Sequence, residues 1–283
     1  MRIASLLPSL PPLKVVDVGA MFIGDGHDAY TKLAQALPCE VIGFEPVASE
    51  CEKLVAMNIP GRSYLPYFVG DGSARTFYEC NFPMTSSLFE PNTALLEKFQ
   101  CLEELTRVVK TSTVQTSRLD DIPATAGVDF LKLDVQGGEL LVLQGAEARL
   151  KDALVIHTEI EFVPLYKGQP LFADIDTFLR ARGFAFHTLS TWGRTFKPLI
   201  PNNNPNLALS QKLWGDAVYI KDFMAFETLS PEALLKIAVI CHENYAAYDV
   251  AGVALEAYDR KLGTGLQMAY LKDLAEELNR PKT

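Results

Sequence analysis

The sequence predicts an α/β fold: a doubly wound, mostly parallel β-sheet followed by a helical segment at the C-terminus. Short apolar runs alternate with stretches of helical spacing, each about 10 to 15 residues long, as in chains of β-α units. The central apolar runs do not alternate with polar residues, which is typical of strands covered on both faces. After Phe223 the strand signals almost disappear while the helical spacing continues. We therefore predict one domain over residues 1–223 and a helical appendix over 224–283, used for association or docking.

The first half of the chain contains three predicted strands of the main sheet. The apolar run from Leu13 to Ala20 predicts the first, and the run from Cys39 to Pro46 predicts the second. Pro66 indicates that the third strand lies at or near a sheet edge, because proline cannot donate a ladder hydrogen bond. A helix is expected over residues 28–37, and Ser49 is the expected N-cap of a helix that reaches Met57.

The second half predicts further strands and helices around a long middle segment. Residues 74–80 and 111–122 are expected to form an extra strand and an edge strand. Gly183 is the expected C-cap of an amphipathic helix that begins near Leu171. The remaining expected elements are strands 130–134, 153–162, 185–190 and 216–223, and a helix over 139–150.

Composition restricts the classes of protein and of partner. The chain has 283 residues, a formal net charge of -9 and a pI of about 5.0, which argue against a nucleic acid as partner because such binders need a basic face. The five cysteines are scattered without a Cys-x-x-Cys pair, as expected of reduced thiols in the cytoplasm. No apolar run is long enough to span a membrane. We expect a soluble, cytoplasmic protein with no nucleic-acid or membrane partner.

Acidic residues follow several predicted strands at the points where the strands end. Asp17, Glu45, Asp134 and Glu159 occupy such positions, and the carboxyl ends of parallel strands form the ligand-binding edge of an open α/β sheet. Each acid by itself is also compatible with a helix cap. The first loop, "DVGAMFIGDG", lacks the Gly-x-Gly-x-x-Gly pattern and carries a carboxylate where a pyrophosphate would be repelled. A cationic ligand such as S-adenosylmethionine fits better, with Glu45 accepting hydrogen bonds from the ribose hydroxyls.

Six motifs in a fixed order identify a family resemblance. The segments "VVDVGA", "VIGFEP", "GDGSARTFY", "MTSSLFEP", "SRLDDI" and "FLKLDVQGGELLVLQGA" resemble the FkbM family of S-adenosylmethionine-dependent methyltransferases over residues 15–223. The resemblance implies a class I methyltransferase fold with a Rossmann-like, seven-stranded sheet. It also implies O-methylation of a hydroxyl group on a sugar or secondary metabolite.

The resemblance also implies roles for individual residues. Two departures weaken the match, since Met21 replaces an Asn of the first loop with Gly24 displaced, and Gln136 replaces a Glu. The implied cofactor-binding residues are Asp17, Gly19 and Ala20 in the first loop, Glu45 and Pro46 at the ribose, Asp71 and Gly72 toward the adenine, and Ser87 of the pair Ser86–Ser87; Asp134 is the acid after the fourth strand.

Transfer of a methyl group to an alcohol requires removal of the hydroxyl proton. Asp134, His157 and Glu159 are the candidate catalytic residues, and strand alternation places Glu161 on the same face as the last two. For His157 taken alone, a hydrogen-bonded residue of the core is the favoured interpretation. Asp134 and Glu159 are also candidate ligands of a divalent cation. Glu139 either caps its helix electrostatically or faces the acceptor.

Several alternatives remain open at the level of function. N-methylation would use the same cofactor half. A non-catalytic protein that binds S-adenosylmethionine and acts as a scaffold through its helical tail would explain the altered first loop. A nicotinamide-dependent oxidoreductase is disfavoured by Asp17 and by the missing glycine pattern. The expected partners are a small-molecule or carbohydrate acceptor and a second copy of the chain bound through the C-terminal helices. The loop with Trp192, Arg194 and Lys197 either contacts the acceptor or is a solvated loop.

Overall fold

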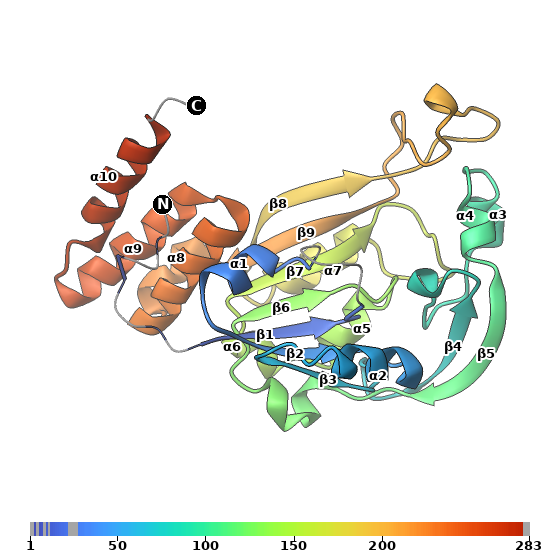
Figure 1. The fold of residues 1–283 in the computed structure, drawn as a ribbon, viewed down its shortest axis with the longest axis horizontal. Coiled ribbons are helices and arrows are strands. Elements are labelled where there is room, and N and C mark those ends of the chain that lie inside the picture. Colours follow the sequence, from blue (N-terminus) through green and yellow to red (C-terminus); the bar gives the residue numbers. More distant parts are fainter. Residues whose placement is uncertain (1–2, 4–5, 8–9, 11, 22–27, 280–283) are drawn as a thin grey trace.

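The computed structural model describes residues 3, 6, 7, 10, 12–21 and 28–279, and its centre is a seven-stranded sheet (Figure 1). The strand order is β3-β2-β1-β6-β7-β9-β8. Neighbouring strands from β3 to β7 pair in parallel, whereas β9 is antiparallel to both β7 and β8. The predicted mostly parallel sheet is therefore confirmed, with β3 at one edge as Pro66 indicated. The strands of this sheet are β1 (Leu13–Val18), β2 (Cys39–Phe44), β3 (Arg62–Leu65), β6 (Phe130–Leu133), β7 (Val155–Glu161), β8 (Phe184–Trp192) and β9 (Trp214–Lys221).

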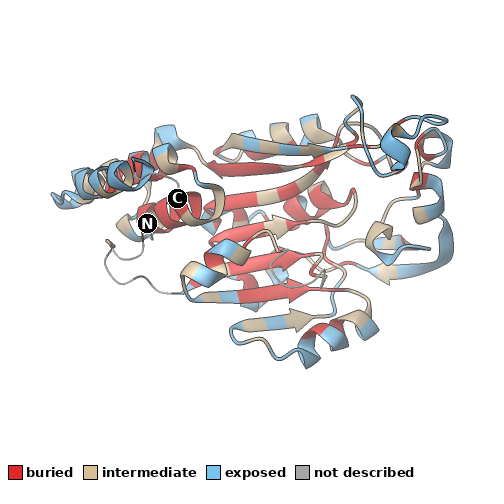
Figure 2. Cartoon of the chain, turned by 45° about the horizontal axis from the view of Figure 1, so that its top comes forward, coloured by how far each residue is buried: buried red, intermediate tan, exposed pale blue. Residues whose placement is uncertain are grey.

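The two additional predicted strands form a separate antiparallel ribbon. β4 (Ala74–Cys80) pairs with β5 (Val108–Gln115), not with the main sheet. Figure 1 shows this ribbon curving away beyond the carboxyl ends of the central strands, with α3 (Thr93–Leu96) and α4 (Leu102–Leu105) at its far end. β5 is almost wholly exposed, as the pale colour in Figure 2 shows. The ribbon thus extends the binding edge of the sheet.

Helices cover both faces of the sheet, each over its own apolar core. On one face, Val16, Leu131 and Ile156 pack against α5 (Glu139–Gln144), α6 (Arg149–Asp152) and α7 (Phe172–Arg180). On the other face, Val15 and Phe130 pack against α1 (Thr31–Ala36) and the C-terminal helices. α2 (Ala48–Ala56) contacts β3 at the edge of the sheet. This alternation of faces along each strand follows from the period of two of β-structure.

The C-terminal helices are α8 (Pro231–Tyr245), α9 (Tyr248–Leu262) and α10 (Leu266–Leu278). Ser230 caps α8 by accepting a hydrogen bond from the Ala233 amide, and Pro231 is its first residue. α8 is buried along most of its length and shares a core with β1, β6, β7 and β9 (Figure 2). The appendix is therefore helical, as expected. Because it completes one face of the sheet, the division between residues 223 and 224 stays a prediction.

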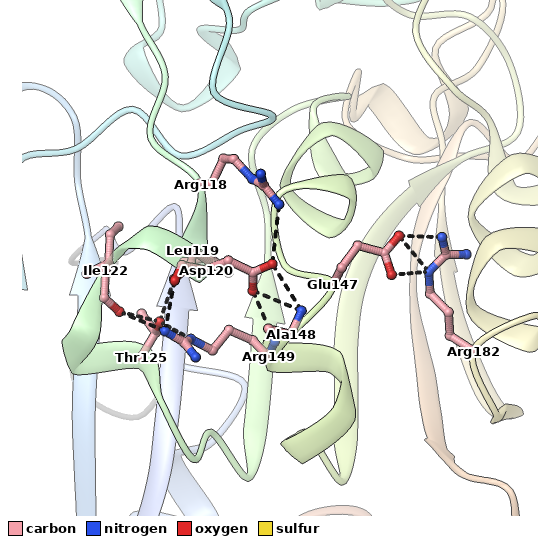
Figure 3. A network of polar contacts seen from close by, with 9 residues as sticks. All are labelled: Arg118, Leu119, Asp120, Ile122, Thr125, Glu147, Ala148, Arg149 and Arg182. Carbon is pink, nitrogen blue, oxygen red and sulfur yellow. Dashed lines mark hydrogen bonds and ion pairs between the residues drawn. The ribbon is translucent and has the colours of Figure 1, made fainter.

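Two local predictions were wrong. Ser49 is not an N-cap, because α2 begins at Ala48 and Val47 precedes it. The helix expected over 139–150 is interrupted after Gln144, because Gly145 lies against the Gly70 carbonyl and α6 starts separately. Figure 3 shows what fixes that second start: the Asp120 carboxylate accepts hydrogen bonds from the backbone amides of Ala148 and Arg149. A cap supplied from a distant turn is invisible to helical periodicity.

Candidate active site

The acid at the end of β1, Asp17, is largely buried and lines one wall of a cavity beside the first loop. The residue is 4% exposed, and its Oδ2 accepts a hydrogen bond of 3.0 Å from the Tyr30 hydroxyl. Its Oδ1 lies 3.0 Å from Lys132 Nζ, in ion-pair range but outside hydrogen-bond alignment. Asp17 therefore supports the first loop through these two partners, and its role beside a cationic cofactor stays a prediction.

The first loop, Gly19 and Ala20, turns over the end of β2 and touches the turn after β6. The amides of Gly19 and Ala20 both donate to the Phe44 carbonyl. Gly19 has a φ of +83°, and a Cβ there would lie 1.9 Å from the Asp134 carbonyl oxygen. Only glycine combines this left-handed conformation with so close an approach. The predicted cofactor loop and the predicted catalytic turn are thus in direct contact. Met21 borders the loop, and Gly24 lies outside the described residues.

Glu45 follows β2 and is 5% exposed, with Pro46 directly after it. Its Oε1 accepts a hydrogen bond of 2.7 Å from the Val47 amide. Burial, assisted by the nearby Glu50 charge, raises the pKa of Glu45 to about 7. A buried carboxyl group at this position is suited to binding a diol, because donors from the ligand would replace the water that burial removed.

Lys132 is a central residue of the site that the sequence reasoning did not single out. It lies on β6 among apolar neighbours, and its Nζ donates a hydrogen bond of 2.9 Å to the Gly19 carbonyl. The same ammonium group is 3.7 Å from Asp134 Oδ2. Burial alone would lower the pKa of Lys132, but the Asp17 and Asp134 charges outweigh it and hold the pKa above its usual range. A lysine within an otherwise apolar strand is unusual, because lysine is rarely buried without a partner, and this could have identified Lys132 from the sequence.

Asp134 and Glu159 meet at the carboxyl ends of β6 and β7, as predicted, and Gln136 joins them. Gln136 Nε2 donates to Asp134 Oδ1 at 3.0 Å and to Glu159 Oε2 at 2.6 Å. Burial and the Asp134 charge raise the pKa of Glu159 well above its usual value. The side chain of Asp134 is 41% exposed, so this carboxylate is accessible to an acceptor. The two acids therefore form one unit at the mouth of the sheet.

His157 has partners at both ring nitrogens. Nδ1 lies 3.1 Å from the Tyr245 hydroxyl of α8, and Nε2 lies 3.4 Å from Asp216 Oδ2 of β9. The ring also stacks on Tyr245. These contacts favour the second interpretation of His157, a hydrogen-bonded residue of the core, over a role as general base.

Two further acids are buried behind the pair. Glu139 accepts a hydrogen bond of 2.7 Å from the Val135 amide and is 1% exposed, so it supports its own turn and does not face an acceptor. Burial raises the pKa of Glu139 to about 7. Burial and the Glu139 charge likewise raise the pKa of Glu161. Glu161 is on the same face of β7 as Glu159, and within the described part of the chain its Oε2 has no hydrogen-bond partner.

The remaining predicted site residues make contacts with their own turns. Asp71 accepts hydrogen bonds from Ser73 and pairs with Arg75, and these partners hold the pKa of Asp71 at about 2 although burial opposes them. The Gly72 amide donates to Thr116 Oγ1. These contacts do not test a role toward the adenine.

The serine pair connects the ribbon to the catalytic turn. The Ser86 hydroxyl accepts a hydrogen bond from the Cys80 amide of β4. Ser87 is 1% exposed, and its hydroxyl donates a hydrogen bond of 2.6 Å to the Gln136 carbonyl. Ser87 is therefore placed to fix the turn after β6. The sequence placed Ser87 among the cofactor-binding residues but could not indicate this contact.

The loop between β8 and β9, expected to contact the acceptor, is held by its own side chains. Arg194 donates to the Gly193 and Asn206 carbonyls, and Lys197 pairs with Glu103 of α4. Trp192 remains 44% exposed at the start of the loop. Of the three side chains proposed for acceptor binding, Trp192 and Lys197 are exposed and Arg194 is half-buried.

Neither the cavities nor the acidic groups define a metal centre. One cavity, with a volume of about 800 Å³, is lined by Asp17, Ala20, Tyr30 and Arg62 and reaches the amino ends of β1 and β2 near Pro12. It borders the cofactor loop without including Asp134 or Glu159, so it is not the acceptor site. Over residues 12–21 and 28–279, no group of three or more His, Cys, Asp or Glu side chains is arranged to hold a metal ion.

No helix in those ranges is long and apolar enough to cross a membrane.

The sheet order, the antiparallel β9 and the ligand edge define a class I methyltransferase fold. The family model described as the methyltransferase FkbM domain matches residues 17–186, more than half of the chain. The chain therefore belongs to the FkbM family of S-adenosylmethionine-dependent methyltransferases, as the six motifs predicted.

Comparison with solved structures gives only distant similarities. Magnesium protoporphyrin IX methyltransferase (ChlM) from Synechocystis PCC 6803 with bound SAM is 12% identical, with a TM-score of 0.37 over 78% of this chain and 76% of that chain. The 16S rRNA (adenine(1408)-N(1))-methyltransferase from Catenulisporales acidiphilia with its cosubstrate SAM is 14% identical, with a TM-score of 0.33 over 78% of this chain and 90% of that chain. No curated protein matches the chain.

Proposed function

We propose that the protein transfers a methyl group from S-adenosylmethionine to a hydroxyl group of a small, carbohydrate-like acceptor. The observation that carries this proposal is the contact between the Gly19 loop and the Asp134 turn, with the exposed Asp134 side chain linked to Glu159 beside it. A donor bound by the loop would thus present its methyl group next to two carboxyl groups.

The residues fit the donor at two points. Glu45 offers a buried carboxyl group to the ribose hydroxyls, and the missing side chain of Gly19 lets the first loop lie directly against the Asp134 turn. When bound, S-adenosylmethionine supplies an electrophilic methyl group on a sulfonium. Lys132 donates a hydrogen bond to the Gly19 carbonyl and pairs with Asp17. The two residues therefore contribute by preorganising the loop for the donor.

Asp134 is the proposed general base. Its carboxylate takes the proton of the acceptor hydroxyl as the oxygen forms its bond to the methyl carbon and the carbon–sulfur bond breaks, leaving neutral S-adenosylhomocysteine. Lys132 places a positive charge 3.7 Å from the Asp134 carboxylate. Glu159, whose pKa is raised, stays protonated into a higher pH range and can donate a hydrogen bond to the acceptor.

A methylation assay with a panel of acceptors tests this proposal. The panel contains sugars, phenols and primary amines of similar size, with transfer of a labelled methyl group as the measurement. We expect transfer to hydroxyl compounds, and a large loss of turnover in Asp134→Asn with S-adenosylhomocysteine affinity retained. Transfer to amines alone would replace O-methylation by N-methylation. A protein that binds the donor and methylates no acceptor in the panel, whereas a known methyltransferase does so in parallel, would favour the scaffold alternative.

A further inference from the structure

Gln136 has an unusual backbone conformation and is fixed from several sides. Its φ is +58°, in the left-handed region that a residue with a side chain rarely adopts. The Ser87 hydroxyl donates to its carbonyl, and the Tyr166 hydroxyl lies 3.2 Å from its Oε1. Tyr166 is 2% exposed and also reaches the Thr85 carbonyl at 2.9 Å. A strained residue held by buried partners on two other segments indicates a constraint on where its side chain points.

That side chain points between the two acids. A primary amide has two N–H donors, and Gln136 Nε2 uses this capacity on Asp134 Oδ1 and Glu159 Oε2. With its oxygen facing Tyr166, the amide cannot flip without placing that oxygen against two carboxyl groups. The amide N–H groups thus lie between the two carboxyl groups and offset part of the repulsion between them.

We propose that Gln136 is a positioning residue which holds Asp134 and Glu159 as a pair facing the transferred methyl group. This inference rests on the proposed function, because it takes Asp134 as the base and the Gly19 loop as the donor site. The effect of Gln136 is to fix the geometry of the two carboxyl groups through the two hydrogen bonds of its amide nitrogen.

Other charged and titratable groups lie near Asp134 and Glu159, and their charges also influence any pH-dependent property of the pair. The charged and titratable groups around it are Lys132 of β6, Glu139 of α5, Glu161 of β7, Tyr166 of the following loop and Asp216 of β9. None of these groups is altered in the variants below, so differences between the proteins report on Gln136.

The test uses the charge difference between two ligands. S-adenosylmethionine carries a sulfonium and S-adenosylhomocysteine does not, so the ratio of their dissociation constants reports the negative charge beside the methyl position. We expect this preference for S-adenosylmethionine to increase with pH in the native protein, as Glu159 ionises. In Gln136→Met the midpoint should move up by about one pH unit, since the ionised carboxylates lose hydrogen-bond donors. S-adenosylhomocysteine affinity should stay within about threefold, as expected for an intact pocket.

Two further proteins make the result specific. Gln144→Met is the same change at an exposed position of α5 and should leave the midpoint in place. Gln136→Glu keeps the size of the side chain and adds a like charge, so it should raise the midpoint at least as far as Gln136→Met and provides the test should the methionine variant not fold. A native midpoint in the Gln136 variants would overturn the inference, as would an equal loss of affinity for both ligands.

Separate variants distinguish this inference from the proposed function. If Asp134→Asn and Glu159→Gln leave the ligand preference and its pH dependence unchanged, the acids do not lie beside the methyl group, and the proposed function fails together with the role of Gln136. If those two variants respond and the Gln136 variants do not, only the role of Gln136 is wrong.

Discussion

At the scale of single residues, Glu45 gives the most direct prediction for the donor site. Replacement of Glu45 by Ala should weaken S-adenosylhomocysteine binding about ten- to a hundredfold, because a hydrogen-bonded charge is worth about 1.5–3 kcal/mol. Calorimetric titration measures the change. Glu50→Ala, at a neighbouring and more exposed position of α2, is the control and should bind normally. Unchanged affinity in Glu45→Ala would remove Glu45 from the donor site.

The raised pKa of Glu45 predicts a pH dependence with a definite sign. Burial raises the folded-state pKa to about 7. Because the folded protein holds this proton more tightly than the unfolded chain, the carboxyl group makes the protein less stable as pH rises toward 7. The ionised form is the better acceptor for the ribose hydroxyls, so S-adenosylhomocysteine affinity should increase as pH rises through about 7. Glu45→Gln does not titrate, and its affinity should lose this dependence; an identical pH profile would contradict the assignment.

The sequence predicted the acids of the site but not their partners. Asp17, Glu45, Asp134 and Glu159 follow strands, and parallel strands bring their carboxyl ends to one edge, so position alone could place them. The Tyr30 and Lys132 contacts of Asp17 and the amide of Gln136 depend on side-chain directions in three dimensions. For the same reason His157 was predicted at the right strand position while its engagement by Tyr245 and Asp216 could not be foreseen.

At the scale of elements, the start of α6 depends on a side chain from another segment. Asp120→Ala removes the acceptor for the Ala148 and Arg149 amides seen in Figure 3, which should lower the free energy of unfolding by about 1 kcal/mol, the usual cost of a lost helix cap. Asp121→Ala is the matched control, since Asp121 is the exposed neighbour in the same turn. Urea denaturation of both variants checks the difference, and equal stabilities would show that the cap contributes nothing.

Some elements of secondary structure are determined by the local sequence, whereas others depend on contacts between distant segments. β1, β2, β6 and β7 were predicted because their apolar runs reflect burial on both faces. β4 and β5 were predicted as strands, yet their pairing with each other, apart from the sheet, is a property of the chain's path between them. The break between α5 and α6 comes from Gly145 meeting Gly70, a contact between residues far apart in sequence.

At the scale of the whole molecule, the packing of α8 predicts the effect of truncation. A chain ending at Phe223 loses the helix that covers Val15 and Phe130, together with the buried ion pair between Lys236 and Asp129. We expect it to aggregate, because it exposes one full face of the sheet. A chain ending at Gly263 lacks only α10, in which Tyr270 is the one buried residue among those described, and should remain folded. Circular dichroism and light scattering distinguish the two, and a folded, monodisperse 1–223 fragment would contradict the packing argument.

Association through the C-terminal helices stays a prediction, and the same fragments address it. Met268, Leu271 and Leu278 are exposed apolar residues of α10. If the helices join two copies, the 1–263 fragment should have half the mass of the full chain by light scattering. An unchanged mass would leave α10 without a role in association.

The position of α8 also determines when the enzyme can form during synthesis. β1 and β6 leave the ribosome well before α8, which covers both of them. Their apolar face therefore stays uncovered until α8 has emerged. The nascent chain should therefore become resistant to protease only after residues beyond Tyr245 have emerged, and it should depend on chaperones until then.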